Sequence, residues 1–299
     1  MARASELVER GILSHVERRQ PSARAGLAVT HVVLLVALVI TGLLPLLWLA
    51  KAAVSTTQDT VSDPLALFPS GEIAWGNLAD AWTTGRVGQF LLNTAEIAAG
   101  TVIATLVVSL TAAYVISVLR PVWGRYFFAA ILATLFIPGV ISLVPLYLTV
   151  VSLPPFGVSL LNTYWAIWLP ASANAVVVVI VQRFFDGIPR ELFDAARIDG
   201  AGAFRVFILI ALPLSRPIIG VVALLTAVNS WKEFLWPLIV ISDGSRQPIS
   251  VALAQSAQST TLSFQLAGML LAVLVPIVLF VAFQRSFLRG VSATGGIKG

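Results

Sequence analysis

A charged stretch at residues 190–200 interrupts a chain that is otherwise mostly apolar, and its residue types suit contact with a partner protein. The helix macrodipole favours acidic residues in the first half of a helix, so a short helix is expected after Pro189. A glycine then permits a sharp turn. A basic residue on a partner could pair with either acid, and the alternative is an ordinary solvated loop. The candidate contact residues are Glu191, Asp194, Ala195, Ala196 and Gly200.

A second polar group follows a long apolar run and consists of Asn229, Trp231, Lys232 and Glu233. Ionisable residues within membrane segments are costly and usually functional. Asparagine and tryptophan could offer hydrogen bonds and stacking to a passing solute. Tryptophan and lysine are also ordinary anchors at a membrane surface. The sequence therefore leaves two interpretations open, a pathway lining and an anchor at the outer interface.

The residues that would indicate an enzyme are missing. The chain has no G-x-x-x-x-G-K-[ST] phosphate loop, and Gly200-Ala201-Gly202 is too short for a dinucleotide fingerprint. It has no cysteine and only two histidines, His15 and His31. We therefore predict no catalytic residues and no metal site, and the chain is not expected to hydrolyse ATP.

The composition is that of a membrane protein that crosses the bilayer several times. Apolar residues make up 58% of the chain and charged residues 11%, with a mean hydropathy of +0.93. The pI near 10.1 does not indicate nucleic-acid binding, because the positive charges lie at the ends of apolar runs. A membrane-spanning helix needs about 20 apolar residues. Six segments qualify, at about residues 26–50, 89–118, 126–152, 163–182, 206–241 and 264–283.

Lysine and arginine predict the orientation of these spans. Fourteen of them fall at the two ends of the chain and in the loops after the second and fourth spans, whereas four fall on the opposite side. The positive-inside rule makes the richer side cytoplasmic. Both termini and the loop that contains Asp194 are therefore expected in the cytoplasm. Residues 1–24, with Leu7, Ile12 and Val16 among charged neighbours, are expected to form a cytoplasmic amphipathic helix.

Several motifs occur in an order that resembles one family. Asp194-Ala195-Ala196, three residues, Gly200, nine residues and Ile210-x-Leu212-Pro213 resemble the "EAA" loop of ABC importer permeases. Three further stretches, at residues 136–147, 161–166 and 230–238, resemble the carbohydrate-uptake type, of which maltose permeases are examples. The resemblance covers about residues 77–290. The sequence departs from the family pattern at Asp194, where glutamate is usual, and at Lys232, where asparagine is expected.

The resemblance implies an all-α fold with six transmembrane helices and a cytoplasmic coupling helix between spans 4 and 5. It implies half of the translocation pathway for a sugar or oligosaccharide in a bacterial inner membrane. The partners would be a second homologous permease, two copies of an ATPase subunit, an extracytoplasmic solute-binding protein and membrane lipid. ATP and Mg would bind to the ATPase, so no cofactor is expected in this chain. The docking residues would be those of the Asp194 loop.

The expected organisation has four parts. Residues 1–25 form a cytoplasmic segment, 26–88 the first span and a long external loop, 89–290 the permease core with spans 2–6, and 291–299 a cytoplasmic tail. Three alternatives remain: an importer permease for amino acids or phosphate, a secondary transporter and a membrane-embedded enzyme. A secondary transporter would need ion-coupled acids within the membrane, and Glu96 is the only deep candidate.

Overall fold

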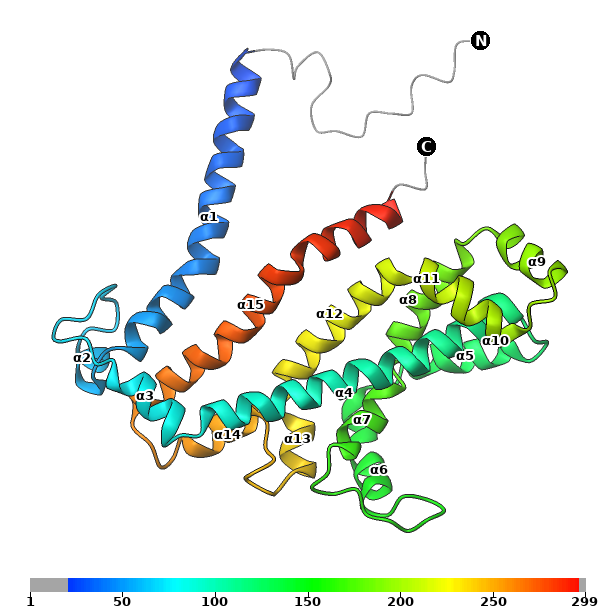
Figure 1. The fold of residues 1–299 in the computed structure, drawn as a ribbon. Coiled ribbons are helices and arrows are strands. Elements are labelled where there is room, and N and C mark those ends of the chain that lie inside the picture. Colours follow the sequence, from blue (N-terminus) through cyan, green and yellow to red (C-terminus); the bar gives the residue numbers. More distant parts are fainter. Residues whose placement is uncertain (1–20, 296–299) are drawn as a thin grey trace.

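The computed structural model describes residues 21–295 as helices joined by loops, without a strand in that range (Figure 1). This confirms the all-α prediction. The first half contains α1 (Pro21–Ala53), α2 (Thr57–Ser62), α3 (Gly76–Thr83), α4 (Val87–Tyr114), the π-helix η2 (Val115–Leu119), α5 (Gly124–Thr134), α6 (Gly139–Val151), α7 (Trp165–Ser172) and α8 (Ala175–Asp186). The second half contains α9 (Arg190–Ile198), α10 (Ala203–Val206), the π-helix η3 (Phe207–Ala211), α11 (Leu212–Leu214), α12 (Arg216–Lys232), α13 (Leu235–Val240), α14 (Ile249–Ser256) and α15 (Leu262–Gly295).

Prolines mark where several of these helices begin. Pro138, Pro189 and Pro248 each precede the first residue of a helix, namely α6, α9 and α14. Pro217 lies in the first turn of α12. Proline is tolerated there because the first backbone N–H groups of a helix have no partner within the helix.

Three helices are long and apolar enough to cross a membrane: Ala25–Ala53, Val87–Leu119 and Leu262–Ala282. Three bent pairs would bring the total to six if each pair is one span, namely Gly124–Thr134 with Gly139–Val151, Trp165–Ser172 with Ala175–Asp186, and Ala203–Leu214 with Arg216–Lys232. The number of spans therefore stays a prediction.

The predicted third span is not the single kinked helix that its apolar run suggests. α5 and α6 meet at an angle of 108°. The break lies directly before Pro138, whose ring disfavours helical geometry in the preceding residue. Pro145 lies inside α6.

The predicted fifth span is also divided. Residues 203–214 and α12 are bent by 75°, with Ser215 at the break. The sequence suggested that the charged loop leads directly into this span. Instead, the short helices α10, η3 and α11 lie between α9 and α12, and Tyr114 of α4 donates a hydrogen bond to the carbonyl of Ala203 at 2.8 Å.

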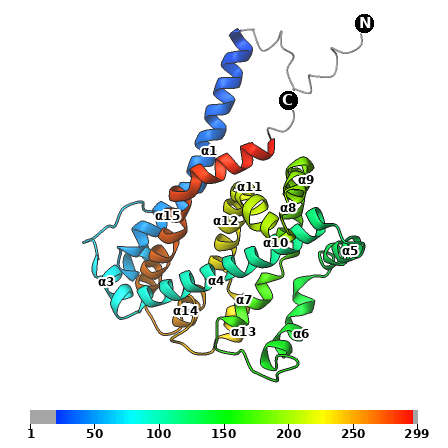
Figure 2. The ribbon, with the colours of Figure 1, turned by 45° about the vertical axis from the view of Figure 1, so that its right-hand side comes forward.

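The buried residues form three clusters along the bundle. The first joins α4, α8, α9 and α12 and includes Tyr114, Val181, Phe193 and Val222. The second surrounds Ile97 and joins α4, α6, α7 and the end of α13. The third lies where α1, α3, α4, α14 and α15 meet (Figure 2). α4 contributes to all three clusters and so connects the two ends of the molecule.

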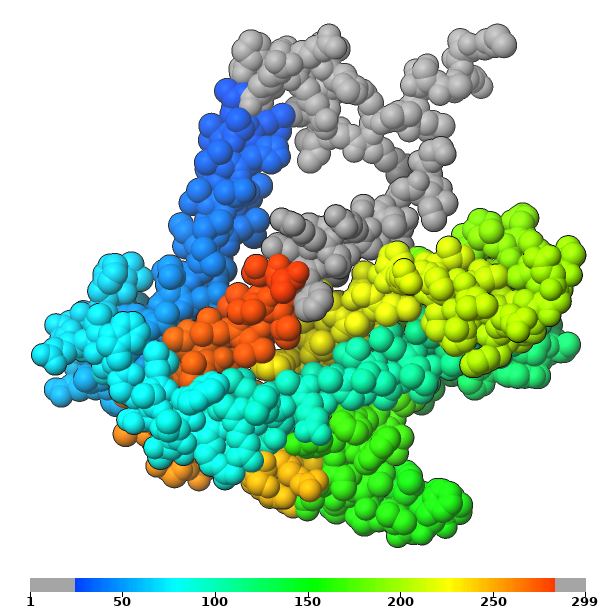
Figure 3. Space-filling view, viewed as in Figure 1, coloured from blue at the N-terminus to red at the C-terminus, as the bar shows by residue number. Residues whose placement is uncertain are grey.

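α1 stands apart from the rest of the bundle. It approaches α15 at one end and diverges from it at the other, and Figure 3 shows it projecting from the packed body. The start of α1, the end of α15 and α9 all lie toward the upper side of Figure 1. The same placement was predicted for the cytoplasmic side, although the orientation itself stays a prediction. The expected amphipathic helix with Leu7, Ile12 and Val16 lies outside the described residues.

Candidate functional site

The charged loop folds as predicted into a short helix, α9. Glu191 lies in its first turn and Arg197 in its last, so both charges complement the macrodipole. The helix ends at Ile198, and Gly200, directly after the C-cap residue Asp199, has φ of +78°. Gly200 N–H donates to the carbonyl of Arg197 at 3.0 Å, and Ala201 N–H donates to the carbonyl of Ala196 at 2.9 Å. These two bonds form a Schellman motif, which usually requires glycine at the left-handed position.

One face of α9 is fixed to the bundle. Phe193 is only 4% exposed and packs in the cluster that contains Phe185 of α8 and Tyr114 and Val118 at the end of α4 and in η2. Arg197 donates a hydrogen bond to the carbonyl of Val118 at 3.2 Å. The Phe193 side chain therefore faces the bundle. α9 is therefore anchored to α4 and α8.

The opposite face of α9 is open. Glu191, Asp194 and Ala195 are exposed, whereas Ala196 is half-buried against the first cluster. Ile198 is an apolar residue with 87% of its surface exposed. Asp194 pairs with Arg197 within the helix at 3.2 Å. An exposed pair of this kind stabilises a helix by only about 0.3–0.5 kcal/mol, so Asp194 can exchange its partner at little cost.

A polar cluster beneath α9 was not recognised from the sequence. Asp186, the last residue of α8, accepts hydrogen bonds from Ser117 of η2 and from Gln182 one turn earlier in α8. Arg120 lies 3.5 Å from the same carboxylate, in a left-handed conformation with φ of 49°. The cluster ties the end of α8 to the segment after α4. In the sequence, only the four-residue spacing of Gln182 and Asp186 could have indicated this cluster. The other two members, Ser117 and Arg120, are distant in the sequence.

A cavity of about 500 Å³ lies between α4, α6, α7, α8, α12 and α13. Its volume falls within the range of small-molecule sites, roughly 300–1,000 Å³. Part of its lining is apolar and includes Leu146, Ile180 and Leu225. The polar side chains in its lining are Thr101, Thr105, Asn174, Thr226, Asn229, Ser230, Glu233 and the indole of Trp236.

Two helix breaks lie at the cavity wall. Asn174 separates α7 from α8, which are bent by 47°, and accepts a hydrogen bond from Val177 N–H at 3.2 Å. Glu233 separates α12 from α13 and has an extended backbone. Its carboxylate accepts a hydrogen bond from Trp236 N–H at 3.5 Å. In transporters, discontinuous helices commonly form solute sites near the middle of the membrane.

The structure separates the four predicted pathway residues. Asn229 and Glu233 line the cavity, whereas Trp231 and Lys232 do not. Successive residues of a helix point about 100° apart, so Trp231 turns into the protein and is only 9% exposed. The Lys232 side chain is exposed and has no hydrogen bond or ion pair to the described side chains and backbone of residues 25–282. Glu96 is exposed on α4 and also lies outside the lining.

The sequence analysis missed the hydroxyl groups of the cavity. Thr101 and Thr105 are four residues apart, so they share one face of α4. Ser230 lies 3.5 Å from Thr101, and Thr105 donates to the carbonyl of Ala171 at 3.2 Å. The four-residue spacing of Thr101 and Thr105 within an apolar run could have indicated a shared polar face on this helix. The other cavity walls come from segments far apart in the sequence.

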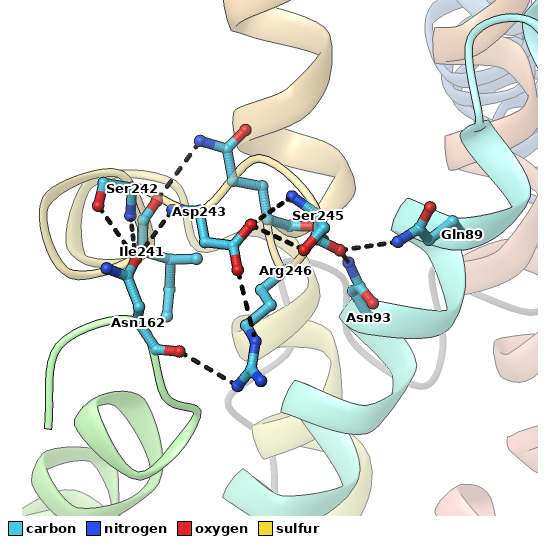
Figure 4. A network of polar contacts seen from close by, with 9 residues as sticks. Gln89, Asn93, Asn162, Ile241, Ser242, Asp243, Ser245 and Arg246 are labelled. Atoms are coloured by element: carbon cyan, nitrogen blue, oxygen red, sulfur yellow. Dashed lines mark hydrogen bonds and ion pairs between the residues drawn. The ribbon is translucent and has the colours of Figure 1, made fainter.

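The loop between α13 and α14 lies toward the lower side of Figure 1, away from α9, and Figure 4 shows the polar contacts that hold it. The side-chain oxygen of Asn162 accepts hydrogen bonds from Ser242 N–H at 2.7 Å and Asp243 N–H at 2.8 Å. Asp243 accepts from the hydroxyl of Ser245 at 2.7 Å and lies 3.6 Å from Arg246. These contacts lower the pKa of Asp243, with the Ser245 hydrogen bond as the largest cause.

The same loop is tied to α4. Gln89 and Asn93 each donate a hydrogen bond to the carbonyl of Ser245 at 2.9 Å. Thr94 accepts one from Ile249 N–H at 2.9 Å. The loop therefore connects α13, which forms part of the cavity wall, to the start of α4.

Comparison with known proteins identifies relatives over most of the chain. Residues 105–293 match the family described as "Binding-protein-dependent transport system inner membrane component". The probable ABC transporter permease protein YurM of Bacillus subtilis is 34% identical over 85% of this chain and 83% of its own length. The sn-glycerol-3-phosphate transport system permease protein UgpE of Pectobacterium atrosepticum is 31% identical over 89% of this chain and 96% of its own.

Two further comparisons extend this similarity. The arabinooligosaccharides transport system permease protein AraQ of Halalkalibacterium halodurans is 32% identical over 85% of this chain and 91% of its own. A chain from the crystal structure of a bacterial ABC transporter that imports the acidic polysaccharide alginate has a TM-score of 0.75 and 18% identity. That match covers 93% of this chain and 99% of the other chain.

Proposed function

Because this chain belongs to the family of binding-protein-dependent transport system inner membrane components, we propose that it forms half of the solute pathway of an ATP-driven importer. The observation that carries the proposal is the physical connection between the α9 surface and the cavity. Phe193 and Arg197 hold α9 against α4 and α8, and these two helices also supply Thr101, Thr105 and Val177 to the cavity wall.

The complete importer needs partners. We propose a second homologous permease for the other half of the pathway, two copies of an ATPase subunit and an extracytoplasmic solute-binding protein. ATP and Mg would bind in the ATPase subunits. The setting would be a bacterial inner membrane, with both termini and α9 in the cytoplasm.

Coupling would begin at α9. The exposed Glu191, Asp194 and Ile198 would enter a cleft on the ATPase, and a basic residue there would replace Arg197 as the partner of Asp194. Closure of the ATPase pair would move α9. Because the buried Phe193 joins α9 to α4 and α8, the movement would change the cavity.

The cavity favours a neutral carbohydrate. Its hydroxyl and amide groups can exchange hydrogen bonds with sugar hydroxyls, and the Trp236 ring offers a face for stacking. Among the described residues that line the cavity, Glu233 is the only ionisable one, so this lining carries a carboxylate and no cation. Relatives named for sn-glycerol-3-phosphate and for arabinooligosaccharides differ in the charge of the solute. The Glu233 carboxylate would repel phosphorylated or acidic sugars.

The test is uptake into proteoliposomes that contain the complete importer and its binding protein. Asn229→Ala removes a hydrogen-bonding group from the wall and should lower uptake of a neutral oligosaccharide about tenfold, the equivalent of roughly 1.4 kcal/mol. Gln258→Ala, on an exposed loop away from the cavity, is the matched control. Glu233→Gln should raise uptake of an acidic sugar relative to a neutral one. Unchanged uptake in Asn229→Ala, together with unchanged selectivity in Glu233→Gln, would reject this cavity as the pathway.

A further inference from the structure

The segment between α1 and α3 carries an apolar tip that the importer function does not use. Residues 65–68, which we call the apolar tip, have the sequence Leu-Ala-Leu-Phe. Leu65 is 89% exposed and Phe68 is 80% exposed, and Leu67 is exposed beside them. Three large apolar side chains in four residues form an unusual surface on an external loop, because such loops are generally polar.

Hydrogen bonds place the apolar tip beside α1 rather than beyond its end. Trp48 donates from its indole nitrogen to the carbonyl of Pro64 at 2.6 Å, and Lys51 donates to the carbonyl of Asp63 at 3.4 Å. Trp48 precedes Ala53, the last residue of α1, by five positions, which is about 7.5 Å along a helix. The chain therefore turns back after α2 and runs alongside the end of α1, as the loop near α2 in Figures 1 and 3 shows.

The same residues mark the depth of the membrane surface. The span Ala25–Ala53 has 29 residues and a length of about 43 Å, more than the roughly 30 Å hydrocarbon core. Its outer end must therefore lie in the interface, or the helix must tilt. Trp48 and Lys51 are the residue types that occupy that interface. The apolar tip begins one residue after Pro64, at the depth of Trp48.

A buried ion pair holds the loop in this position. Lys51 is only 4% exposed and lies 3.4 Å from the carboxylate of Asp59 in α2. The other oxygen of Asp59 accepts a hydrogen bond from Ser70 N–H at 3.2 Å. The segment that carries the apolar tip is thus held to the final turns of α1 at its start, through Lys51 and Trp48, and to α2 at its end, through Asp59.

We propose that Leu65, Leu67 and Phe68 enter the outer leaflet of the bilayer at the boundary between headgroups and acyl chains. The apolar side chains of α1 are exposed from Val29 to Leu47, so the tip lies next to a helix that is suited to contact lipid. Asp63 and Glu72 flank the tip without entering it, which leaves the charges in the headgroup region. A docked binding protein would instead meet the groups farthest from the membrane.

The absence of cysteine in the natural sequence makes a direct test practical. Phe68→Cys and, separately, Leu65→Cys would be labelled with an environment-sensitive fluorophore in the assembled importer. The importer would be reconstituted in phosphatidylcholine–phosphatidylglycerol vesicles without binding protein. Ser259→Cys, on the exposed loop between α14 and α15, is the matched control. Quenching by a lipid with a nitroxide near its headgroup would be compared with quenching by aqueous iodide.

The proposal predicts strong lipid-nitroxide quenching and at least a threefold lower iodide quenching constant at residues 65 and 68 than at residue 259. Iodide access equal to that of the control would overturn it. Protection from both quenchers would also overturn it, because the second permease would then cover the tip. Iodide access that is lost when binding protein is added would assign the tip to protein docking instead.

Discussion

Replacement of Gly100 by alanine tests whether α4 and α7 pack as closely as the structure indicates. A Cβ at Gly100 would lie 2.1 Å from Cε2 and 2.3 Å from Nε1 of Trp168, and real Cβ contacts essentially never fall below 3.0 Å. The indole cannot move freely. It donates a hydrogen bond to the carbonyl of Ile97 at 3.1 Å, and its ring centroid lies 5.2 Å from that of Trp165.

The magnitude follows from three opposing effects. Overpacking of this kind costs about 1–3 kcal/mol, and loss of the Trp168 hydrogen bond costs about 1 kcal/mol. Alanine in place of glycine within a helix recovers at most about 1 kcal/mol. Gly100→Ala should therefore destabilise the protein by about 1–3 kcal/mol. It should also lower uptake, because Ile97 and Thr101 on either side line the cavity.

Gly220→Ala in α12 provides the matched control. No atom lies within 4 Å of the Cβ position at Gly220, so this change should be neutral or stabilising by up to about 1 kcal/mol. Chemical unfolding of the purified complex would measure both variants. The double variant Gly100→Ala with Trp168→Phe should regain part of the loss, because the smaller ring leaves the contact. Equal stability of the Gly100 and Gly220 variants would refute the close packing.

Three further predictions concern the loops and helix ends. Gly200→Val forces a β-branched residue to φ of +78°, at a cost of about 1–2 kcal/mol or more, so it should uncouple ATP hydrolysis from uptake. Gly202→Val should leave coupling intact, because the backbone at Gly202 is extended. Equal coupling of ATP hydrolysis to uptake in the two variants would contradict the Schellman motif at Gly200. Lys232→Ala should change uptake per assembled complex less than twofold, because Lys232 lies outside the cavity. A tenfold loss of uptake would show that Lys232 lines the solute pathway after all. The folded pKa of Asp243 lies below 3.8, so its contribution to the loop is present above that value and is lost as the pH falls through the folded pKa. Hydrogen exchange of residues 242–247, corrected for intrinsic rates, should therefore rise in acid for the natural chain, whereas in Asp243→Ala it should be fast at every pH; a pH-independent natural loop would disprove the assignment.

The sequence was most informative where a local pattern determines the structure. Long apolar runs located the three long apolar helical segments Ala25–Ala53, Val87–Leu119 and Leu262–Ala282 to within a few residues. Pro189 and Gly200 fixed the limits of α9, because each residue restricts the backbone independently of its surroundings. The all-α class followed from the same runs.

The sequence failed where distant segments or helix phase decide the outcome. Residues 206–214 are as apolar as a membrane span, so the break at Ser215 was not visible. Because Trp231 and Lys232 are close to Asn229 in the sequence, all three were predicted to line the pathway. Successive residues of a helix point in different directions, however, and Trp231 and Lys232 lie outside the cavity lining. Two partners of Asp186, namely Ser117 of η2 and Arg120 directly after it, could be recognised only after α4 and α8 had been placed side by side.

The central claim is that α9 receives the movement of the ATPase, and a cross-linking experiment tests it directly. Ile198→Cys exposes a single thiol on the outward face of α9, where the natural side chain is 87% exposed. A short thiol–amine cross-linker would be added to the assembled, transport-active complex, with Ser259→Cys as the control from the opposite side. The account predicts that residue 198 cross-links to the ATPase subunit and residue 259 does not. A fully active complex in which residue 198 never reaches the ATPase, or reacts with an impermeant reagent from outside the cell, would contradict it.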